Sequence, residues 1–133
     1  MASLFTKIIN GEIPCYKIAE DENYFAFLDI FPLSKGHTLV VPKKEIDYIF
    51  DIDDTTLSGL MLFAKKVALA IDKSVKCTRV GVAVVGLEVP HAHIHLVPLH
   101  SLHDIDFSRP KLKLEKEEME KIAATIRENI SKA

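Results

Sequence analysis

The stretch His91-Ala92-His93-Ile94-His95-Leu96-Val97 decides how the rest of the chain is interpreted, because polar and apolar residues alternate through it. Alternate side chains of a β-strand point to opposite faces, so the three histidines are expected on one face, about 7 Å apart along the chain. The apolar residues between them take the other face and can pack on a helix. Three imidazoles are costly to bury without partners. The pattern therefore predicts a strand over 91–97, ended by Pro98, whose histidines have a polar task.

Two kinds of chemistry fit this row of histidines. Histidines two positions apart on a strand can ligate zinc, and three of them with a water form a hydrolytic site. Alternatively, imidazoles can bind phosphate oxygens and orient one another while one of them attacks phosphorus without a metal. A histidine nucleophile suits neutral pH, because an appreciable fraction of it is unprotonated there. The spacing alone does not separate these two interpretations.

A second stretch, Asp29-Ile30-Phe31-Pro32-Leu33-Ser34-Lys35-Gly36-His37-Thr38-Leu39-Val40-Val41-Pro42-Lys43, joins a carboxylate to a proline-shaped loop and an apolar strand. Gly36 allows a close backbone approach, and His37 could meet the histidine row if the two strands were neighbours. The plainer interpretations are that Asp29 bonds nearby loop amides and that His37 points to water at a strand edge.

The remaining elements follow from periodicity and capping residues. Ser3 can cap a short helix that stops near Gly11 and Pro14. Strands are predicted at 16–18, 24–28, 37–41 and 80–85, the last of them buried because it is β-branched. Longer helices are predicted from Asp53 or Asp54 onward and over 114–130. Clustered, hairpin-linked strands favour an α+β fold, with a five-stranded antiparallel sheet and two main helices in a single domain, 1–133.

Composition limits the classes of function. The chain has 133 residues, of which 48% are hydrophobic and 27% charged, and its net charge is −2. No basic surface is broad enough to predict a nucleic-acid partner, and no apolar run approaches a membrane span. The N-terminal segment lacks the apolar stretch of a signal peptide, so a cytoplasmic protein is expected. Cys15 and Cys77 are expected to be reduced thiols rather than a disulfide or a zinc site.

Together these motifs resemble those of the histidine triad (HIT) superfamily, close to its Hint branch and its bacterial relatives. The likeness covers about 3–98, and 99–133 forms a C-terminal extension. Its carriers are 4–14, Phe27-Leu28-Asp29-Ile30 with Pro32, 36–43 and the histidine strand. The resemblance implies a HIT-like fold of five antiparallel strands that pairs into a ten-stranded sheet in a homodimer.

The resemblance also implies nucleotidyl transfer without a metal or cofactor. A P–N or P–O bond of a purine nucleoside monophosphate derivative would be cleaved through a nucleotidyl-histidine intermediate. His93 resembles the nucleophile and His91 the residue that orients it, while His95, near the leaving group, and His37 resemble the other phosphate-site histidines. Asp29 resembles the carboxylate that accepts the ribose hydroxyls. The implied base pocket consists of Leu4, Phe5, Ile8, Phe27, Ile30 and Leu39.

The turn before the triad departs from the family pattern. Relatives usually carry a Gly-Gln-Ser/Thr run there, whereas this chain has Gly86-Leu87-Glu88-Val89-Pro90. A carboxylate at Glu88 would repel substrate phosphate unless it is protonated, paired or turned away. It could instead recognise an amine leaving group or act as an acid, but a solvent-facing Glu88 is the favoured interpretation.

Three alternative functions follow from this departure and from the histidine row. The protein could be a nucleotide-binding or scaffold protein with little turnover. It could be a dinucleoside polyphosphate hydrolase, although the glutamine that follows the triad in those enzymes is not evident in 96–104. Less favoured is a zinc hydrolase that uses the histidine row, and the N-terminal cysteine pair that some bacterial members use for zinc is absent.

Overall fold

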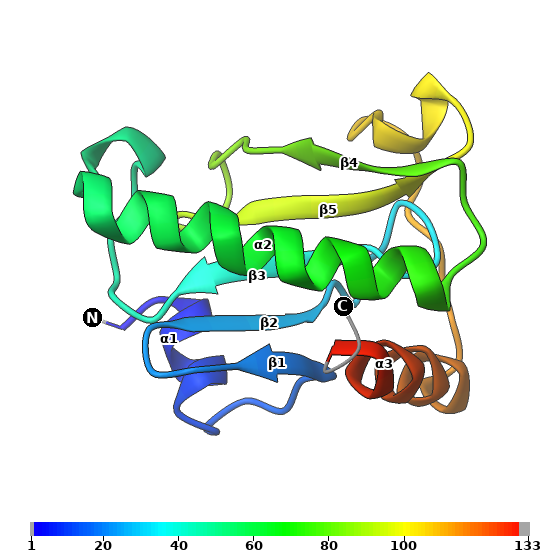
Figure 1. The fold of residues 1–133 in the computed structure, drawn as a ribbon, viewed down its shortest axis with the longest axis horizontal. Helices are drawn as coiled ribbons and strands as arrows, with labels where there is room; N and C mark the ends of the chain where they lie inside the picture. The colour runs from blue at the N-terminus through cyan, green and yellow to red at the C-terminus, as the bar shows by residue number, and fades with distance from the viewer. Residues whose placement is uncertain (1, 131–133) are drawn as a thin grey trace.

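The computed structural model describes residues 2–130 and contains one five-stranded antiparallel sheet in the order β1-β2-β3-β5-β4 (Figure 1). The strands are β1 Lys17–Glu20, β2 Tyr24–Leu28, β3 Thr38–Pro42, β4 Arg79–Ala83 and β5 Ile94–Leu99. The helices are α1 Leu4–Ile9, α2 Asp54–Ser74 and α3 Lys116–Ile130, with short 3-10 helices η1 Ile49–Asp51 and η2 Leu102–Ile105. This architecture confirms the predicted α+β class with two main helices.

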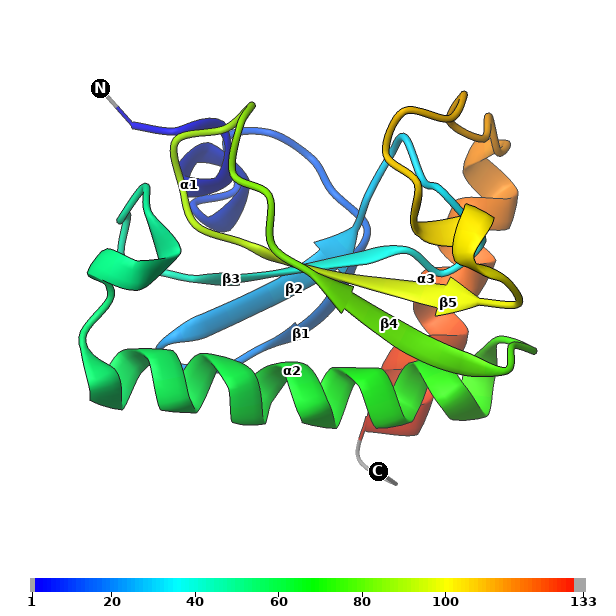
Figure 2. The same ribbon diagram turned by 90° about the horizontal axis from the view of Figure 1, so that it is seen from above.

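The sheet separates two layers of different character (Figure 2). Helices α2 and α3 cover one face, where they build the larger apolar core with alternate residues of the strands. Helix α1 lies on the opposite face, together with the connection between β4 and β5. The smaller core beneath α1 consists of Phe5, Ile8, Phe25, Phe27, Leu39 and Val41. The period-2 alternation of β2 and β3 therefore supplies both cores.

Helix starts follow the capping residues in the sequence. The Ser3 side chain accepts a hydrogen bond from the Thr6 amide at α1, and Asp53 accepts one from Thr56 at α2. Both satisfy an amide that would otherwise lack a partner in the first helical turn. Within residues 2–130, no helix has the length and apolar character needed to cross a membrane.

The strand with the histidines begins later than predicted. β5 starts at Ile94, where it pairs with Val40, so His91 and His93 precede the ladder. The preceding segment is held instead by the Ala92 amide, which donates to the Ile46 carbonyl at 2.7 Å. β5 also continues through Pro98, where the sequence predicts its end. At Pro98 the strand pairs with β4 alone, because its pairing with β3 stops at Leu96. A proline is tolerated where one side of a strand is unpaired.

The prediction that 80–85 is a buried strand is wrong for the single chain. β4 lies at the edge of the sheet, and Val82, Val84 and Val85 are exposed. Edge position leaves one side of a strand without a backbone partner, and β-branched residues occur there as readily as inside. The other strand boundaries differ from prediction by at most two residues.

Candidate functional site

The loop before β3 brings Asp29 back to His37. Gly36 has a φ of 95°, and a Cβ there would lie 2.9 Å from Val75 Cγ2, so glycine is required for both reasons. The His37 amide donates to the Ser34 carbonyl at 3.1 Å, and the Asp29 amide donates to the His37 carbonyl at 3.0 Å. These bonds fix the carboxylate of Asp29 beside the imidazole.

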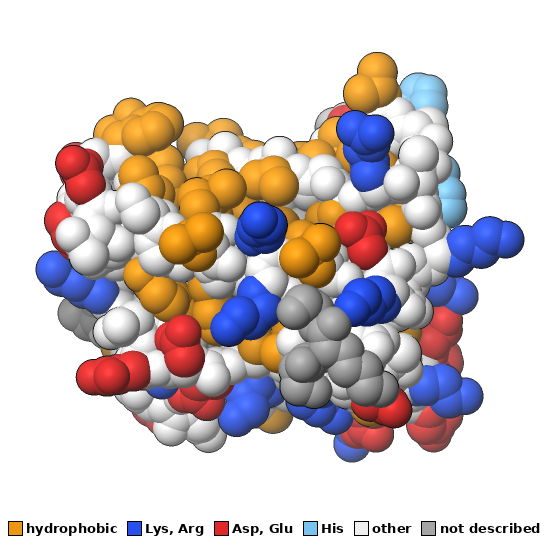
Figure 3. Space-filling view, viewed as in Figure 1, with side chains coloured by type: hydrophobic (Ala, Val, Ile, Leu, Met, Phe, Trp, Pro, Cys, Tyr) orange, Lys and Arg blue, Asp and Glu red, His pale blue; other side chains and the backbone are white. Residues whose placement is uncertain are grey.

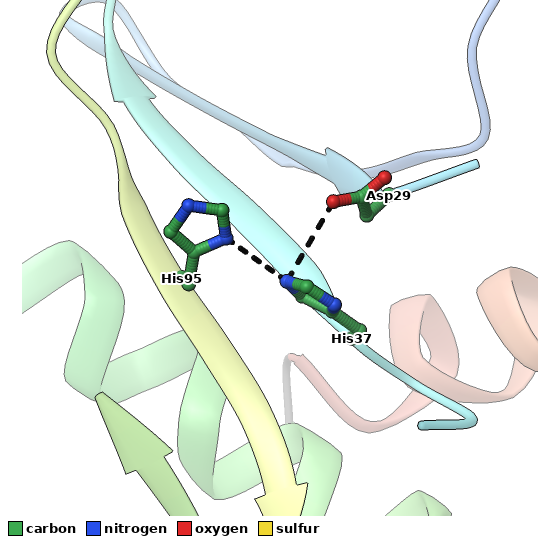
Figure 4. Close-up of side chains that lie close together, drawn as sticks. All are labelled: Asp29, His37 and His95. Atoms are coloured by element: carbon green, nitrogen blue, oxygen red, sulfur yellow. Dashed lines mark hydrogen bonds and ion pairs between the residues drawn. The ribbon is translucent and has the colours of Figure 1, made fainter. Parts of the chain in front are cut away.

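His37 and His95 meet because β3 and β5 are neighbours, as the sequence analysis required. Leu39 and His95 are register partners, and His37 lies on the same face of β3 as Leu39. His37 Nε2 and His95 Nδ1 are 3.0 Å apart, and Asp29 Oδ2 is 3.7 Å from His37 Nε2 (Figure 4). Asp29 after β2, His37 just before β3 and His95 in β5 therefore converge.

The direction of this hydrogen-bond chain follows from a backbone amide. The Leu33 amide donates to His37 Nδ1 at 3.0 Å, so that nitrogen carries no hydrogen. The neutral ring must then carry its hydrogen on Nε2, which donates to His95 Nδ1. His95 in turn carries its hydrogen on Nε2. The pair thus presents an N–H donor at His95.

The same three residues could be taken for a metal site, because Asp29, His37 and His95 offer ligand atoms that lie within 4.8 Å of one another. The donor set does not fit a metal. A cation on His37 Nε2 would leave that ring without a proton on either nitrogen, since Nδ1 already accepts from Leu33. If His37 Nδ1 carried the proton instead, its N–H would face the N–H of the Leu33 amide. The cluster fits a hydrogen-bond relay.

His93 has the opposite polarity to His95. Its Nδ1 is 2.8 Å from the His91 carbonyl oxygen, which can only accept, so Nδ1 carries the hydrogen. The Nε2 atom of His93 therefore holds a lone pair. The His93 ring lies against those of His95 and Phe5, each with a centroid distance of 4.9 Å. The His93 ring therefore offers a lone pair, and the neighbouring ring of His95 offers an N–H donor.

His91 is held at both ring nitrogens and is completely buried. Its Nε2 donates to the Pro42 carbonyl at 2.7 Å, and its Nδ1 lies 2.8 Å from the Ser3 hydroxyl oxygen. The ring is therefore fixed between β3 and the cap of α1, and it offers its backbone carbonyl to His93.

Burial keeps these imidazoles neutral near pH 7. It lowers the pKa of His37 to about 3, with smaller effects from the charges of His95, Lys111 and His93. Burial and then His93 lower the pKa of His95 to about 4. Burial also lowers the pKa of His93 and of His91, and it raises the pKa of Asp29. An uncharged nucleophile and an uncharged donor therefore coexist.

The predicted base-pocket residues fall into two groups. Phe5, Ile8, Phe27 and Leu39 are buried together under α1, whereas Leu4 and Ile30 are 47% and 58% exposed. Glu88 is exposed, in agreement with the favoured interpretation, and its charge makes only a small contribution to the pKa of Asp29 and of His93. The nucleotide-binding roles of all these residues stay predictions.

One contact of the site was not predicted from the sequence. Phe107, in the C-terminal extension, packs its ring 4.7 Å from that of His95. Its segment is anchored by Arg109, whose guanidinium donates to the Leu33 carbonyl at 2.8 Å. A lone aromatic residue among polar ones carries no signal of this contact. His100 and His103 are exposed.

A helix-backed antiparallel sheet with buried histidines converging at β3 and β5 defines a histidine-triad type of domain. The family model for the HIT domain matches residues 10–102. An uncharacterized HIT-like protein of Borreliella burgdorferi is 36% identical over 96% of this chain and 97% of its own. An adenosine 5'-monophosphoramidase of Schizosaccharomyces pombe is 36% identical over 74% of each chain. The structure of a Zn-bound histidine triad family protein from Mycobacterium smegmatis superposes with a TM-score of 0.84 and 27% identity, covering 99% of this chain and 95% of that one.

The chain therefore belongs to the HIT family. That membership supports nucleotide hydrolase activity in general.

Proposed function

We propose that this protein is a metal-independent nucleoside phosphoramidase that acts on purine nucleoside monophosphate derivatives through a nucleotidyl group on His93. The observation that carries the proposal is the hydrogen bond from His93 Nδ1 to the His91 carbonyl, which leaves the Nε2 lone pair for phosphorus. The adenosine 5'-monophosphoramidase among the relatives supports the choice of bond and nucleotide.

The reaction would take place in two displacements at phosphorus. His93 Nε2 forms an N–P bond as the P–N bond of the substrate breaks, and the leaving nitrogen keeps the bonding pair, takes up a proton from solvent and departs as an amine. The N–H on His95 Nε2 would donate a hydrogen bond to the leaving nitrogen. Water then attacks the same phosphorus and loses a proton to solvent, while the N–P bond breaks and its electron pair returns to His93 Nε2, which releases the nucleoside monophosphate.

The neutral histidines favour an amine over a phosphate as leaving group. His37 and His95 are uncharged, so they stabilise a leaving group by hydrogen bonding and not by positive charge. Nearby charges act in both senses, because the Lys111 cation and the Glu88 carboxylate both interact with Asp29. The carboxylate of Glu88 would repel an anionic leaving group and attract a protonated amine.

Asp29 and the buried apolar residues would hold the nucleoside. One oxygen of Asp29 already accepts from the Phe31 amide at 2.9 Å, and the carboxylate has further lone pairs for a ribose diol. Phe5 and Phe27 form an edge-to-face pair at 5.5 Å, which gives the base an aromatic surface.

The test is turnover of adenosine 5'-phosphoramidate by protein treated with a chelator. Turnover that persists without metal and exceeds turnover of diadenosine polyphosphates is expected. Nucleotide binding without turnover would support the scaffold alternative. Activity restored only by added zinc would contradict the proposal and support a zinc hydrolase, and a preference for diadenosine polyphosphates would support the polyphosphate hydrolase.

We also propose that two copies pair through β4. Exposed apolar side chains gather over α2, η1 and β4 on one side of the molecule (Figure 3). The patch consists of Tyr48, Phe50, Met61, Leu62, Leu69, Val82, Val84 and Val85. It surrounds a cleft of about 490 Å³ that reaches His93. A twofold axis beside β4 would join two edges into ten strands and cover the patch.

Light scattering after size exclusion tests this pairing. The wild-type protein is expected to elute as a dimer, and Val82→Lys should shift it toward a monomer, because the substitution places a charge on the paired edge. Glu128→Lys on α3, away from the patch, is the matched control. A monomeric wild-type protein at tens of micromolar would contradict the pairing.

A further inference from the structure

We propose that Glu45, acting through Ser3 and Thr6, positions His91 and thereby aims His93 for attack on phosphorus. These three are positioning residues, because none of them contacts His93 or its lone pair. The inference rests on the proposed function and adds to it a support that comes from outside the histidine row.

The support is a continuous set of short hydrogen bonds. Glu45 Oε1 accepts from the Ser3 amide at 2.6 Å and from the Thr6 hydroxyl at 2.6 Å. The Ser3 hydroxyl oxygen lies 2.8 Å from His91 Nδ1 and accepts from the Thr6 amide at 3.1 Å. Ser3 is buried, while the Glu45 side chain closes the set from the surface.

The direction of each bond follows from the groups that can only accept. The Pro42 carbonyl requires a hydrogen on His91 Nε2, so Nδ1 of the neutral ring is an acceptor. The Thr6 hydroxyl gives its hydrogen to the Glu45 carboxylate, and it lies 3.5 Å from His91 Nδ1. Ser3 is therefore the donor that satisfies His91 Nδ1.

This arrangement bears on the reaction because the His91 carbonyl accepts the hydrogen bond that orients His93 at Nδ1. The His91 ring is hydrogen-bonded at both nitrogens, which also restrains the backbone of His91. The carbonyl of that residue accepts from His93 Nδ1 at 2.8 Å. Loss of the Ser3 donor would leave a buried imidazole nitrogen without a partner. The ring would then turn to find one, and the His93 lone pair would leave its line of attack.

Helix α1 alone does not explain the contact from Glu45. An α-helix of six residues is marginal by itself, and the Ser3 cap already satisfies the Thr6 amide. Glu45 adds a fixed negative charge on the His91 side, because hydrogen bonds from Thr6 and Ser3 hold its pKa at about 2. That negative charge favours positive charge on this side of the site, which is the sign that His93 acquires in the nucleotidyl intermediate.

The experiment compares Ser3→Ala and Glu45→Ala with Ser3→Thr and Glu45→Gln, which keep the hydroxyl and the acceptor oxygen. Each alanine variant is expected to lower kcat on adenosine phosphoramidate roughly tenfold, the value of one hydrogen bond lost in the transition state. KM should stay within about twofold, because nucleotide binding is not altered. Ser3→Thr should recover most of kcat, whereas Glu45→Gln keeps the acceptor oxygen but loses the charge and should recover only part of it. Glu128→Gln on α3 is the control.

A second readout separates positioning from simple anchoring of α1. Nitrogen-15 NMR of the imidazoles should show His91 protonated at Nε2 in the wild type and a mixture of ring states in Glu45→Ala. A higher KM at unchanged kcat, or ring states identical to the wild type, would overturn the proposal. If the wild-type protein has no turnover, the proposed function fails, and the NMR comparison still decides whether Glu45 sets the state of His91.

Discussion

The two sides of the segment 93–96, which opens β5, are buried alike and stabilised differently. Ile94 and Leu96 lie on the side of α2 and are 1% exposed, whereas His93 and His95 lie on the opposite side and are 6% and 8% exposed. Removal from water alone stabilises the apolar pair. The histidines need partners, and they obtain them through His37, the His91 carbonyl and the Leu33 amide. One face of the strand therefore builds the fold, and the other depends on segments far away in the sequence.

The largest expected effect comes from removing the lone pair on the histidine face. His93→Ala should lower turnover of adenosine phosphoramidate by roughly 10³-fold or more, since loss of a nucleophile removes the covalent route. Nucleotide affinity, measured by calorimetry with AMP, should change little, because Asp29 and the apolar residues are intact. A variant that keeps a tenth of the wild-type rate would break the distinction between the faces.

The helical face is tested by Leu96→Ala. The free energy of unfolding in urea should fall by about 2–5 kcal/mol, because the substitution opens a cavity against α2. The folded variant should keep its kcat within a few-fold, since Leu96 does not point toward the histidines. A large loss of kcat at full stability would show that the faces are not separate.

Sequence reasoning reached the elements and the grouping of the histidines because both depend on local pattern. Alternation assigned the faces of β5, and Ser3 and Asp53 marked the helix starts. It could not give the partners of each imidazole, because the Pro42 and His91 carbonyls and the Leu33 amide are backbone groups with no side-chain signature. Phe107 and Glu45 likewise contact the site or its support through tertiary folding alone. The edge position of β4 depended on strand order, which a β-branched run does not encode.

The pH dependence of stability sharpens the comparison further. Folding lowers the pKa of His95 from 6.5 to about 4, so the unfolded chain binds more protons between these values. Stability is therefore fully present above pH 6.5 and is lost progressively as the pH falls toward 4. Urea unfolding at a series of pH values should show this slope. His95→Asn should reduce the slope without removing it, because folding also lowers the pKa of His37, His91 and His93.

The smallest effect is expected at the turn before the row. Glu88 is exposed and outside the hydrogen-bond relay, so Glu88→Gln should change kcat/KM for a neutral-amine phosphoramidate by no more than about threefold. Discrimination against substrates with anionic leaving groups should relax by a similar factor. A pH profile of kcat/KM that shifts strongly in this variant would assign Glu88 a catalytic acid role instead.

The account depends on the direction of the His93 lone pair, and trapping the intermediate tests it most directly. Protein mixed with adenosine phosphoramidate would be quenched within milliseconds to seconds, digested under alkaline conditions that preserve phosphorus–nitrogen bonds, and mapped by mass spectrometry. The account predicts an adenylyl group on His93, absent from His93→Ala. An adenylyl group on His95 or His37, or full turnover without any adduct, would contradict it.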